Sequence, residues 1–273
     1  MRFSNLTPTG IASRLIDLLI GIVTLVAIGA LWEYLVQNGH LNPYFFPPPT
    51  EIADELEKIT TVGFPRGVTI FSHIQATVLR ILKGYAMAAV LGIPIGLFVG
   101  SRQFLDRAVM PVVTFARSVA TISLLPLMVA WFGVGELSRV LLVFYGCFWV
   151  IMTNSAFAVK TIHPQYIQAA ETLGASKTQI FFQVMLPASL PRIFSGMKVA
   201  LGLAFLYIVA VELINAEEGL GSLIWEARTF YRSDTMMVGL FMLSIFGFAL
   251  AQGLDLLEKV LLPWAESLEE IER

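Results

Sequence analysis

Charged residues are scarce in this chain. Asp, Glu, Lys and Arg together make up 14% of its 273 residues, whereas soluble domains carry roughly 25%, so the composition indicates a membrane protein. A formal net charge of −2 without a basic block argues against a nucleic-acid partner. Cysteine is nearly absent: Cys147 alone excludes a disulfide within the chain and a cysteine-rich metal site. The three histidines, His40, His73 and His163, lie far apart and form no H-x-x-x-H pair.

Motifs for enzymatic chemistry are also missing. The chain contains no G-x-x-x-x-G-K-[ST] loop that could hold the phosphates of ATP. Gly133-Val134-Gly135 and Gly219-Leu220-Gly221 do not follow a predicted strand, so we interpret them as turn glycines rather than dinucleotide fingerprints. No Ser/His/Asp or Cys/His set is placed to catalyse a reaction. We therefore expect no active site, cofactor or metal in this chain, and we expect any energy source to be a partner.

Long apolar runs are abundant instead. Hydrophobic residues make up 56% of the sequence, and several runs reach the roughly 20 residues that cross a bilayer. The pattern predicts an all-α polytopic protein, a single domain over residues 1–273 with about six spans. We place these spans near 15–36, 72–100, 108–132, 140–159, 193–216 and 236–257. The first is too long for a signal-peptide core and lacks a small-x-small cleavage site, so we expect it to be retained.

Orientation follows from the number of spans and from the basic residues. Six spans put both termini and the polar segment 160–191 on one side, and Lys and Arg are more numerous there. The positive-inside rule makes that side cytoplasmic. On the other side, Pro47, Pro48 and Pro49 interrupt any helix, and we expect Thr50 to cap a short helix over residues 51–59.

The second span carries a stripe of small residues. Gly84, Gly92, Gly96 and Gly100 recur at intervals of four or eight, which predicts one face where another helix backbone approaches closely. In the more polar first half of this segment, Arg80 and Lys83 are interpreted as side chains that snorkel to the membrane interface.

Residues 160–191 are the longest stretch in the second half too polar for a bilayer. Pro164 suits the first turn of a helix, and a helix is expected over residues 165–173. Gly174 would end it in a left-handed conformation, and Ser176 would cap a second helix over residues 177–185. Leu186-Pro187 and Leu190-Pro191 are expected to end that helix. An amphipathic loop lying on the lipid surface fits the same residues.

The spacing within this hairpin carries a resemblance. The pattern Q-A-A-x-x-x-G-A-S, followed by V-M-L-P, is similar to the "EAA" signature of binding-protein-dependent ABC importer permeases. The resemblance implies that the hairpin is a coupling helix seated in a groove of a separate ATPase subunit. The coupling residues it implies are Gln168, Ala169, Ala170, Glu171, Gly174, Ala175, Leu186 and Pro187. Gln168 stands where the motif name has Glu.

The resemblance covers residues 72–262, the core permease region. Blocks at Ser72–Gly100, Leu124–Glu136 and Val209–Ile224 resemble the nitrate/sulfonate/taurine/bicarbonate branch of these permeases. The family implies a type I, MetI-like fold in the bacterial inner membrane and a permease homodimer. It also implies two ATPase subunits, which bind ATP and Mg, and an external substrate-binding protein. The cargo implied is a small anion such as a sulfonate, nitrate, bicarbonate or related organic acid.

Polar residues within the spans are candidates for the translocation path, because a charge at mid-bilayer costs about 2.5–3.5 kcal/mol on insertion scales. Spacing of i, i+4, i+7 would put Arg117, Thr121 and Leu124 on one helical face, where a guanidinium could attract an anion. The full candidate set is Arg117, Ser118, Thr121, Ser123, Asn154, Glu212 and Asn215. Structural roles remain open, including a pairing of Arg117 with Glu212. Many relatives carry prolines after the equivalent arginine, and the departure here leaves the substrate unassigned.

Two rival functions are compatible with a polytopic helical chain. A secondary transporter or channel would work without an ATPase, but such proteins often contain internal repeats, and none is found in this sequence. A membrane-embedded enzyme would need a catalytic or metal set. The importer permease, which is not itself an enzyme, is the function that the sequence favours.

Overall fold

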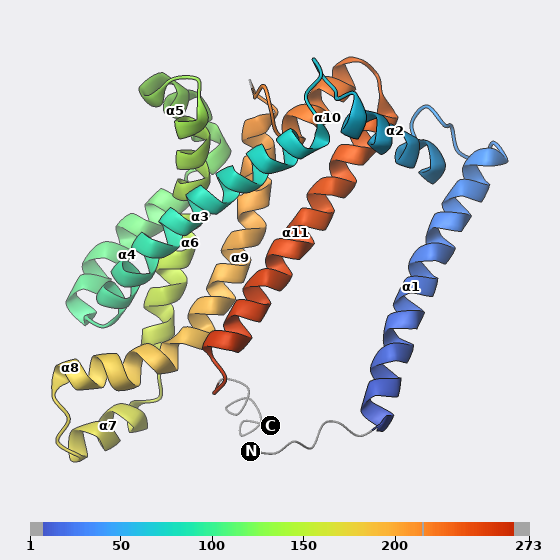
Figure 1. The fold of residues 1–273 in the computed structure, drawn as a ribbon. Coiled ribbons are helices and arrows are strands. Elements are labelled where there is room, and N and C mark those ends of the chain that lie inside the picture. The colour runs from blue at the N-terminus through green and yellow to red at the C-terminus, as the bar shows by residue number, and fades with distance from the viewer. Residues whose placement is uncertain (1–7, 215, 265–273) are drawn as a thin grey trace. The chain divides into compact units, whose positions relative to one another are not determined.

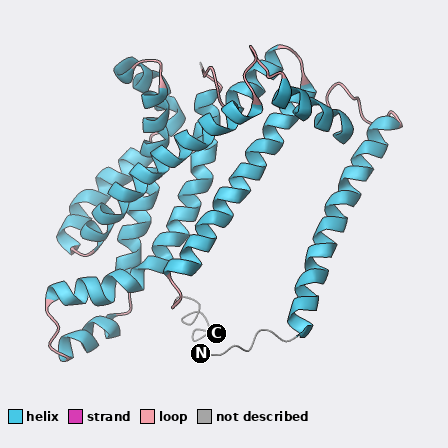
Figure 2. Ribbon diagram, in the orientation of Figure 1, coloured by secondary structure: helices cyan, strands magenta, loops and turns pink. Residues whose placement is uncertain are grey.

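The computed structural model describes residues 8–214 and 216–264, and every regular element within them is a helix (Figures 1 and 2). This confirms the all-α expectation. The predicted cytoplasmic termini and the candidate Asn215 lie outside the described residues. The elements, in order, are α1 (Pro8–Gln37), α2 (Pro49–Thr61), α3 (Ile70–Gly100), α4 (Gln103–Ser118), the 3-10 helix η1 (Thr121–Leu124), α5 (Leu125–Phe132), α6 (Glu136–Lys160), α7 (Pro164–Thr172), α8 (Lys177–Gln179), the π-helix η2 (Ile180–Met185), α9 (Leu186–Glu212), α10 (Leu220–Thr229) and α11 (Ser233–Leu261).

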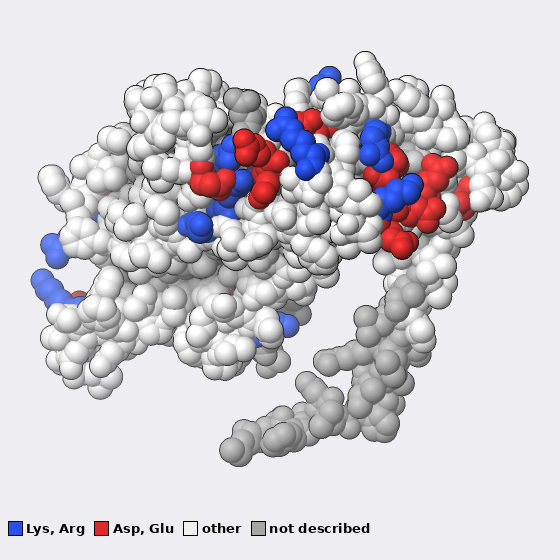
Figure 3. Space-filling model, turned by 45° about the horizontal axis from the view of Figure 1, so that its top comes forward, with Lys and Arg blue, Asp and Glu red and all other residues white. Residues whose placement is uncertain are grey.

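Membrane-spanning length is reached by five of the described helices. These are α1 over Leu19–Gln37, α3, α6, the continuous run Lys177–Glu212, and α11. The segment predicted as a single span near 108–132 is instead broken: α4 and η1–α5 meet at an angle of 81°. If this bent pair counts as one span, the described chain has six. The surface in Figure 3 fits a membrane protein, because charged residues of both signs gather in mixed patches and large areas carry no charged residue.

The chain divides into two compact units, and the first comprises Met1–Ile70 with Glu226–Val238. Within it, the Glu33 carboxylate of α1 accepts hydrogen bonds from the hydroxyl and backbone N–H of Thr50, at 2.9 and 3.3 Å. The prediction that Thr50 caps α2 is therefore wrong, because Pro49 already starts that helix and Thr50 turns its side chain to α1. The buried Glu55 accepts from Arg232 at 2.5 Å and from Thr235 at 2.8 Å.

The second unit comprises Phe71–Trp225 with Gly239–Arg273, and α3 and α6 pack closely within it. A Cβ added at Gly84, Gly96 or Gly100 of α3 would collide with the backbone of α6, and one added at Gly92 would lie 3.3 Å from it. The facing residues are Val140 for Gly84, Phe148 for Gly92, Met152 for Gly96 and Ala156 for Gly100. The constant sequence separation means that the two helices run in the same direction in one register. The predicted small-residue face is confirmed.

Helix α9 runs antiparallel to α6 and completes the core of this unit. Small residues again allow the approach: Gly196 packs on Asn154, and Gly146 on the Tyr207 ring. The Cys147 thiol donates to the Ala200 carbonyl at 3.5 Å. Ile81, Ala88, Val143, Leu201 and Ile208 are buried in the same cluster. The core of the unit thus consists of α3, α6 and α9, with backbone contact between α3 and α6 and glycine-to-side-chain contacts between α6 and α9.

Replacing Gly96 with Leu should destabilise this packing, because the added side chain meets the Met152 carbonyl, which cannot move without breaking α6. Overpacking of this kind costs about 1–3 kcal/mol. Thermal unfolding of the purified protein in nanodiscs measures the loss. Gly202→Leu on α9 is the matched control, since a Cβ at Gly202 meets no atom within 4 Å. Equal melting temperatures for the two variants would contradict the proposed register.

Candidate functional site

The first arm of the 160–191 hairpin is organised by its own short-range signals. Helix α7 starts at Pro164, and the His163 side chain accepts a hydrogen bond from the Gln165 N–H at 3.4 Å. Gly174 ends the arm with a φ of +81°, a conformation that favours glycine. Ser176 and Gln179 then form a reciprocal capping box. The predicted helix, left-handed stop and cap are all confirmed.

The second arm differs from its prediction. The structure runs unbroken from Lys177 to Glu212, so Leu186-Pro187 and Leu190-Pro191 do not end the helix. A π-helical turn over Ile180–Met185 precedes Pro187, which lies in the first turn of α9. The wider turn changes the hydrogen-bond register next to the proline, and this lets the helix continue past a residue that lacks an N–H. The hairpin is therefore continuous with a membrane-spanning helix.

Exposure separates the predicted coupling residues into two groups. Gln168, Ala169, Glu171 and Gly174 are exposed, and Ala170 and Ala175 are half-buried. By contrast, Leu186 packs in a cluster with Leu97, Val159 and Ile193, so it anchors the second arm to the core.

Leu173 was missed by sequence reasoning, although it is 88% exposed at the tip of the hairpin. Its position directly before the helix-ending Gly174 is the signal that could have identified it.

An ion pair lies where the hairpin leaves the core. Lys160, the last residue of α6, pairs with Asp106 in the first turn of α4. Further along α4, the Tyr145 hydroxyl of α6 donates to the Ala116 carbonyl at 2.9 Å. These two contacts attach α4 to α6 at both ends.

The other end of α6, remote from the hairpin, carries a network of charges. Arg80 of α3 donates through Nε and Nη2 to the Glu136 carboxylate, at 2.8 and 2.5 Å. Its Nη1 donates to Glu212 of α9 at 2.7 Å and to the Glu218 carbonyl at 2.6 Å. Arg139 adds a bond to Glu136 at 2.9 Å.

Two sequence-based interpretations are corrected by this network. Arg80 does not snorkel: its side chain is only 4% exposed, and its charge is neutralised within the protein. Glu212 pairs with Arg80 rather than with Arg117. Arg80 precedes Gly84 by one turn on the small-residue stripe, which is the signal that could have placed it on the buried face.

Glycine makes room for this network in the loop before α10. The Thr77 hydroxyl donates to Glu212 at 2.9 Å and accepts from the Leu220 N–H at 2.8 Å. The Gly221 N–H donates to the same carboxylate at 2.9 Å. A Cβ at Gly219 would overlap the Glu212 carboxyl group, and one at Gly221 would lie 2.8 Å from the Glu212 Cβ. These turn glycines therefore leave the space that the buried Glu212 side chain occupies.

The remaining path candidates do not converge on one place. Arg117, Ser118, Thr121 and Ser123 gather around the bend between α4 and α5, where all but the half-buried Thr121 are exposed. The expected i, i+4, i+7 face through Arg117 is wrong, because α4 ends at Ser118 and the chain turns before Thr121.

Asn154 lies elsewhere, in the second half of α6. Its side chain donates to the Val150 carbonyl at 2.8 Å and packs against Gly196 of α9. It therefore contributes to the core packing rather than to the bend.

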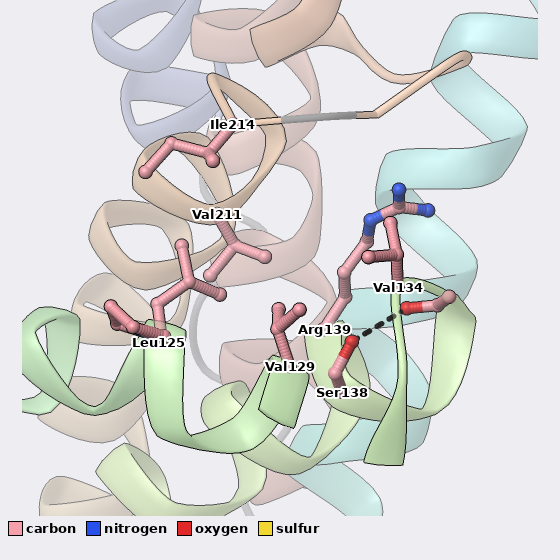
Figure 4. Close-up of a pocket in the computed structure, with 9 residues that line it drawn as sticks. Leu125, Val129, Val134, Ser138, Arg139, Val211 and Ile214 are labelled. Carbon is pink, nitrogen blue, oxygen red and sulfur yellow. Dashed lines mark hydrogen bonds between the residues drawn. The ribbon is translucent and has the colours of Figure 1, made fainter. Parts of the chain in front are cut away.

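A cavity of about 190 Å³ opens beside the charge network (Figure 4). Leu125, Val129, Val134 and Val211 form its apolar walls, and Ser138 and Arg139 contribute polar atoms. The Ser138 hydroxyl is held by the Gly135 carbonyl at 2.9 Å. Within residues 8–214 and 216–264, no three His, Cys, Asp or Glu side chains are grouped to hold a metal ion.

Known proteins resemble this chain along most of its length. The family model described as "Binding-protein-dependent transport system inner membrane component" matches residues 92–266. The taurine transport system permease protein TauC of Escherichia coli is 34% identical over 255 residues, covering 92% of this chain and 91% of TauC. The bicarbonate transport system permease protein CmpB of Synechocystis is 28% identical, covering 90% of each chain.

The fold is shared with a solved structure. The MetNI methionine ABC transporter, in an inward-facing conformation, superposes with a TM-score of 0.61 at 22% identity over 69% of this chain and 94% of that chain. This likeness concerns the fold alone and confirms the MetI-like architecture expected from the sequence.

Arg80→Gln should destabilise the protein by about 3–5 kcal/mol, because it leaves the buried Glu212 carboxylate without its cation. Thermal unfolding of Arg80→Gln, Glu212→Gln and the double variant measures the coupling. The double variant should lose less than the sum of the single losses. Lys83→Gln, an exposed position on the same helix, is the control. Strictly additive losses would show that the pair is not coupled.

Proposed function

This chain belongs to the family of inner-membrane components of binding-protein-dependent transport systems, and on that premise we propose that it forms the pathway of an ATP-driven importer for a small anion. Its multi-pass helical architecture suits a permease. The chain contains no phosphate-binding loop, so a separate ATPase would supply the energy. The chain itself would have no catalytic site and no cofactor, and ATP and Mg would bind to the partner.

The exposed, locally ordered hairpin is the observation that supports an ATPase partner. Side-chain caps at the starts of α7 and α8 order its first arm and its tip locally. Ala169, Ala170 and Gly174 offer a narrow surface that fits into a groove, with Leu173 exposed beside them. Leu173 is 88% exposed at the tip proposed to be cytoplasmic. Covering this apolar side chain with a partner would remove it from water and stabilise the complex.

Movement of the hairpin would reach the membrane through two connections. Its first arm joins α6 across three residues, and its second arm is one continuous helix with α9. ATP binding would close the two ATPases, displace the hairpin and shift the population between inward-open and outward-open permease pairs. The hairpin acts mechanically, so the chain needs only a rigid link.

A second permease copy would complete the pathway. Helices α4 and α5 carry large exposed apolar side chains, namely Val112, Phe115, Trp131 and Phe132. We infer that this face meets its counterpart in a homodimer, since Arg117 and the bend would then border the space between the copies. The hairpin end would be cytoplasmic, with both termini on that side, and the charge network would face the external binding protein.

The proposed cargo class rests on two observations. Relatives carry names that refer to taurine and bicarbonate, which are small molecules with an anionic group. Arg117 presents an exposed guanidinium in the last turn of α4, beside Ser118. An exposed guanidinium suits the oxygens of a sulfonate or carboxylate.

Ala169→Trp and Leu173→Asp should each weaken co-purification with the ATPase at least tenfold. The tryptophan is too large to enter the ATPase groove, and the aspartate would place a charge in that groove. Pull-down from membranes that co-express the ATPase encoded beside this chain measures the loss. Ala251→Trp, on the exposed side of α11, should leave association intact. Full association of both hairpin variants, or ATP-independent uptake in vesicles, would contradict the coupling role.

Arg117→Gln should raise the KM for the transported anion about tenfold, as expected when one charge-assisted hydrogen bond is lost. Uptake of radiolabelled anion into proteoliposomes containing the whole transporter gives KM and rate. Arg107→Gln, an exposed arginine near the opposite end of α4, is the matched control. An unchanged KM would remove Arg117 from the anion pathway.

A further inference from the structure

The four charges at the external end of α6 differ sharply in exposure. The Arg80 and Arg139 side chains are 4% and 10% exposed, and Glu212 is fully buried. The Glu136 side chain, in contrast, is 62% exposed. Three of the four groups therefore lie inside the protein, while the fourth covers them from the solvent side.

Glu136 binds its two arginines in the manner of a ligand. One oxygen accepts from Nη2 of Arg80 and from Nη1 of Arg139, at 2.5 and 2.9 Å. The other oxygen accepts from Nε of Arg80 at 2.8 Å. Arg80 thus presents a two-pronged edge of the kind that recognises carboxylate and other oxyanions. A sulfonate has three oxygens, so it could accept hydrogen bonds from both guanidinium groups without one oxygen being shared between them.

The charge balance supports exchange of this carboxylate for a solute. Arg80 and Arg139 are balanced by Glu136 and Glu212, so the closed cluster is neutral. When Glu136 turns into solvent, the two guanidinium groups carry one positive charge more than the Glu212 carboxylate offsets. Such a charge calls for a new anion.

The neighbouring cavity limits the kind of anion. Arg139 and Ser138 border it, and its walls are Leu125, Val129, Val134 and Val211 (Figure 4). Its volume of about 190 Å³ is below the roughly 300–1,000 Å³ typical of drug-sized ligands. The space suits a short aliphatic body attached to the anionic group.

We propose that Arg80 and Arg139 form an anion subsite at the external mouth of the permease, closed by Glu136 and opened when a small organic sulfonate or carboxylate displaces it. This subsite rests on the proposed importer function, since it is the first position at which a solute released from the binding protein would meet the chain. Glu136 acts as an internal competitor. The apparent affinity for the solute is reduced by the small fraction of time that Glu136 is displaced.

Ethanesulfonate is the probe, and its binding to the purified permease in nanodiscs is measured by calorimetry, without ATPase or binding protein. Glu136→Gln removes the competing charge but keeps the size of the side chain. It should bind ethanesulfonate at least tenfold tighter than the wild type. Adding Arg139→Gln should abolish that gain. Sulfate, which lacks the aliphatic body, should gain less, and ethylammonium should not bind.

Glu217→Gln is the matched control, because Glu217 is an exposed carboxylate outside the network. An equal gain in that variant, or no gain in Glu136→Gln, would overturn the subsite. If Glu136→Gln does not fold, Glu136→Asp, whose shorter side chain reaches the arginines less well, should show an intermediate gain. A parallel uptake assay with the whole transporter keeps the two proposals apart. Uptake without a binding gain refutes only the subsite, and a binding gain without ATP-dependent uptake refutes only the importer.

Discussion

The buried guanidinium of Arg80 is the constraint on which the packing of the second unit depends. A guanidinium taken out of water is costly unless its hydrogen bonds and its charge are matched. Arg80 finds its partners on α6, on α9 and in the loop before α10. Satisfying this one group therefore sets the relative positions of three membrane-spanning helices and the segment that leads into α10.

The glycine stripe and this ion network solve different parts of the packing problem. Glycines spaced by four allow α3 and α6 to touch, but a repeat of this kind also fits after a slip of four residues. Such a slip would move Arg80 about 6 Å along the helix axis and separate it from Glu136. The facing pairs from Gly84 to Gly100 keep the same sequence separation as Arg80 and Glu136. Small residues thus permit the contact, and the charges select its register.

Sequence reasoning succeeded where the determining interactions are local. Gly174, Ser176 and Pro164 specify the hairpin within a few residues of themselves, and the glycine stripe is visible as a periodic pattern. It failed where the partner is distant. Arg80 and Glu212 lie more than a hundred positions apart, so neither could be assigned a partner before the helices were placed. The break after Ser118 depends on tertiary contacts, and the continuation of the helix through Pro187 depends on a π-turn. Neither can be predicted from single residues.

The distribution of contacts in the second unit indicates where a conformational change can occur. Helices α3, α6 and α9 are joined by backbone approach and by buried charges, so relative sliding among them would break many contacts at once. Helix α4 is held to α6 by Lys160–Asp106 and Tyr145–Ala116, and beyond Ala116 its end and the 81° bend are largely exposed. The first arm and the tip of the hairpin are also exposed, whereas its second arm packs on the core through Phe181, Met185 and Leu186. Motion in a transport cycle should therefore be concentrated in the first arm of the hairpin and the α4–α5 bend, while the three-helix core carries displacement from one end to the other as a rigid body.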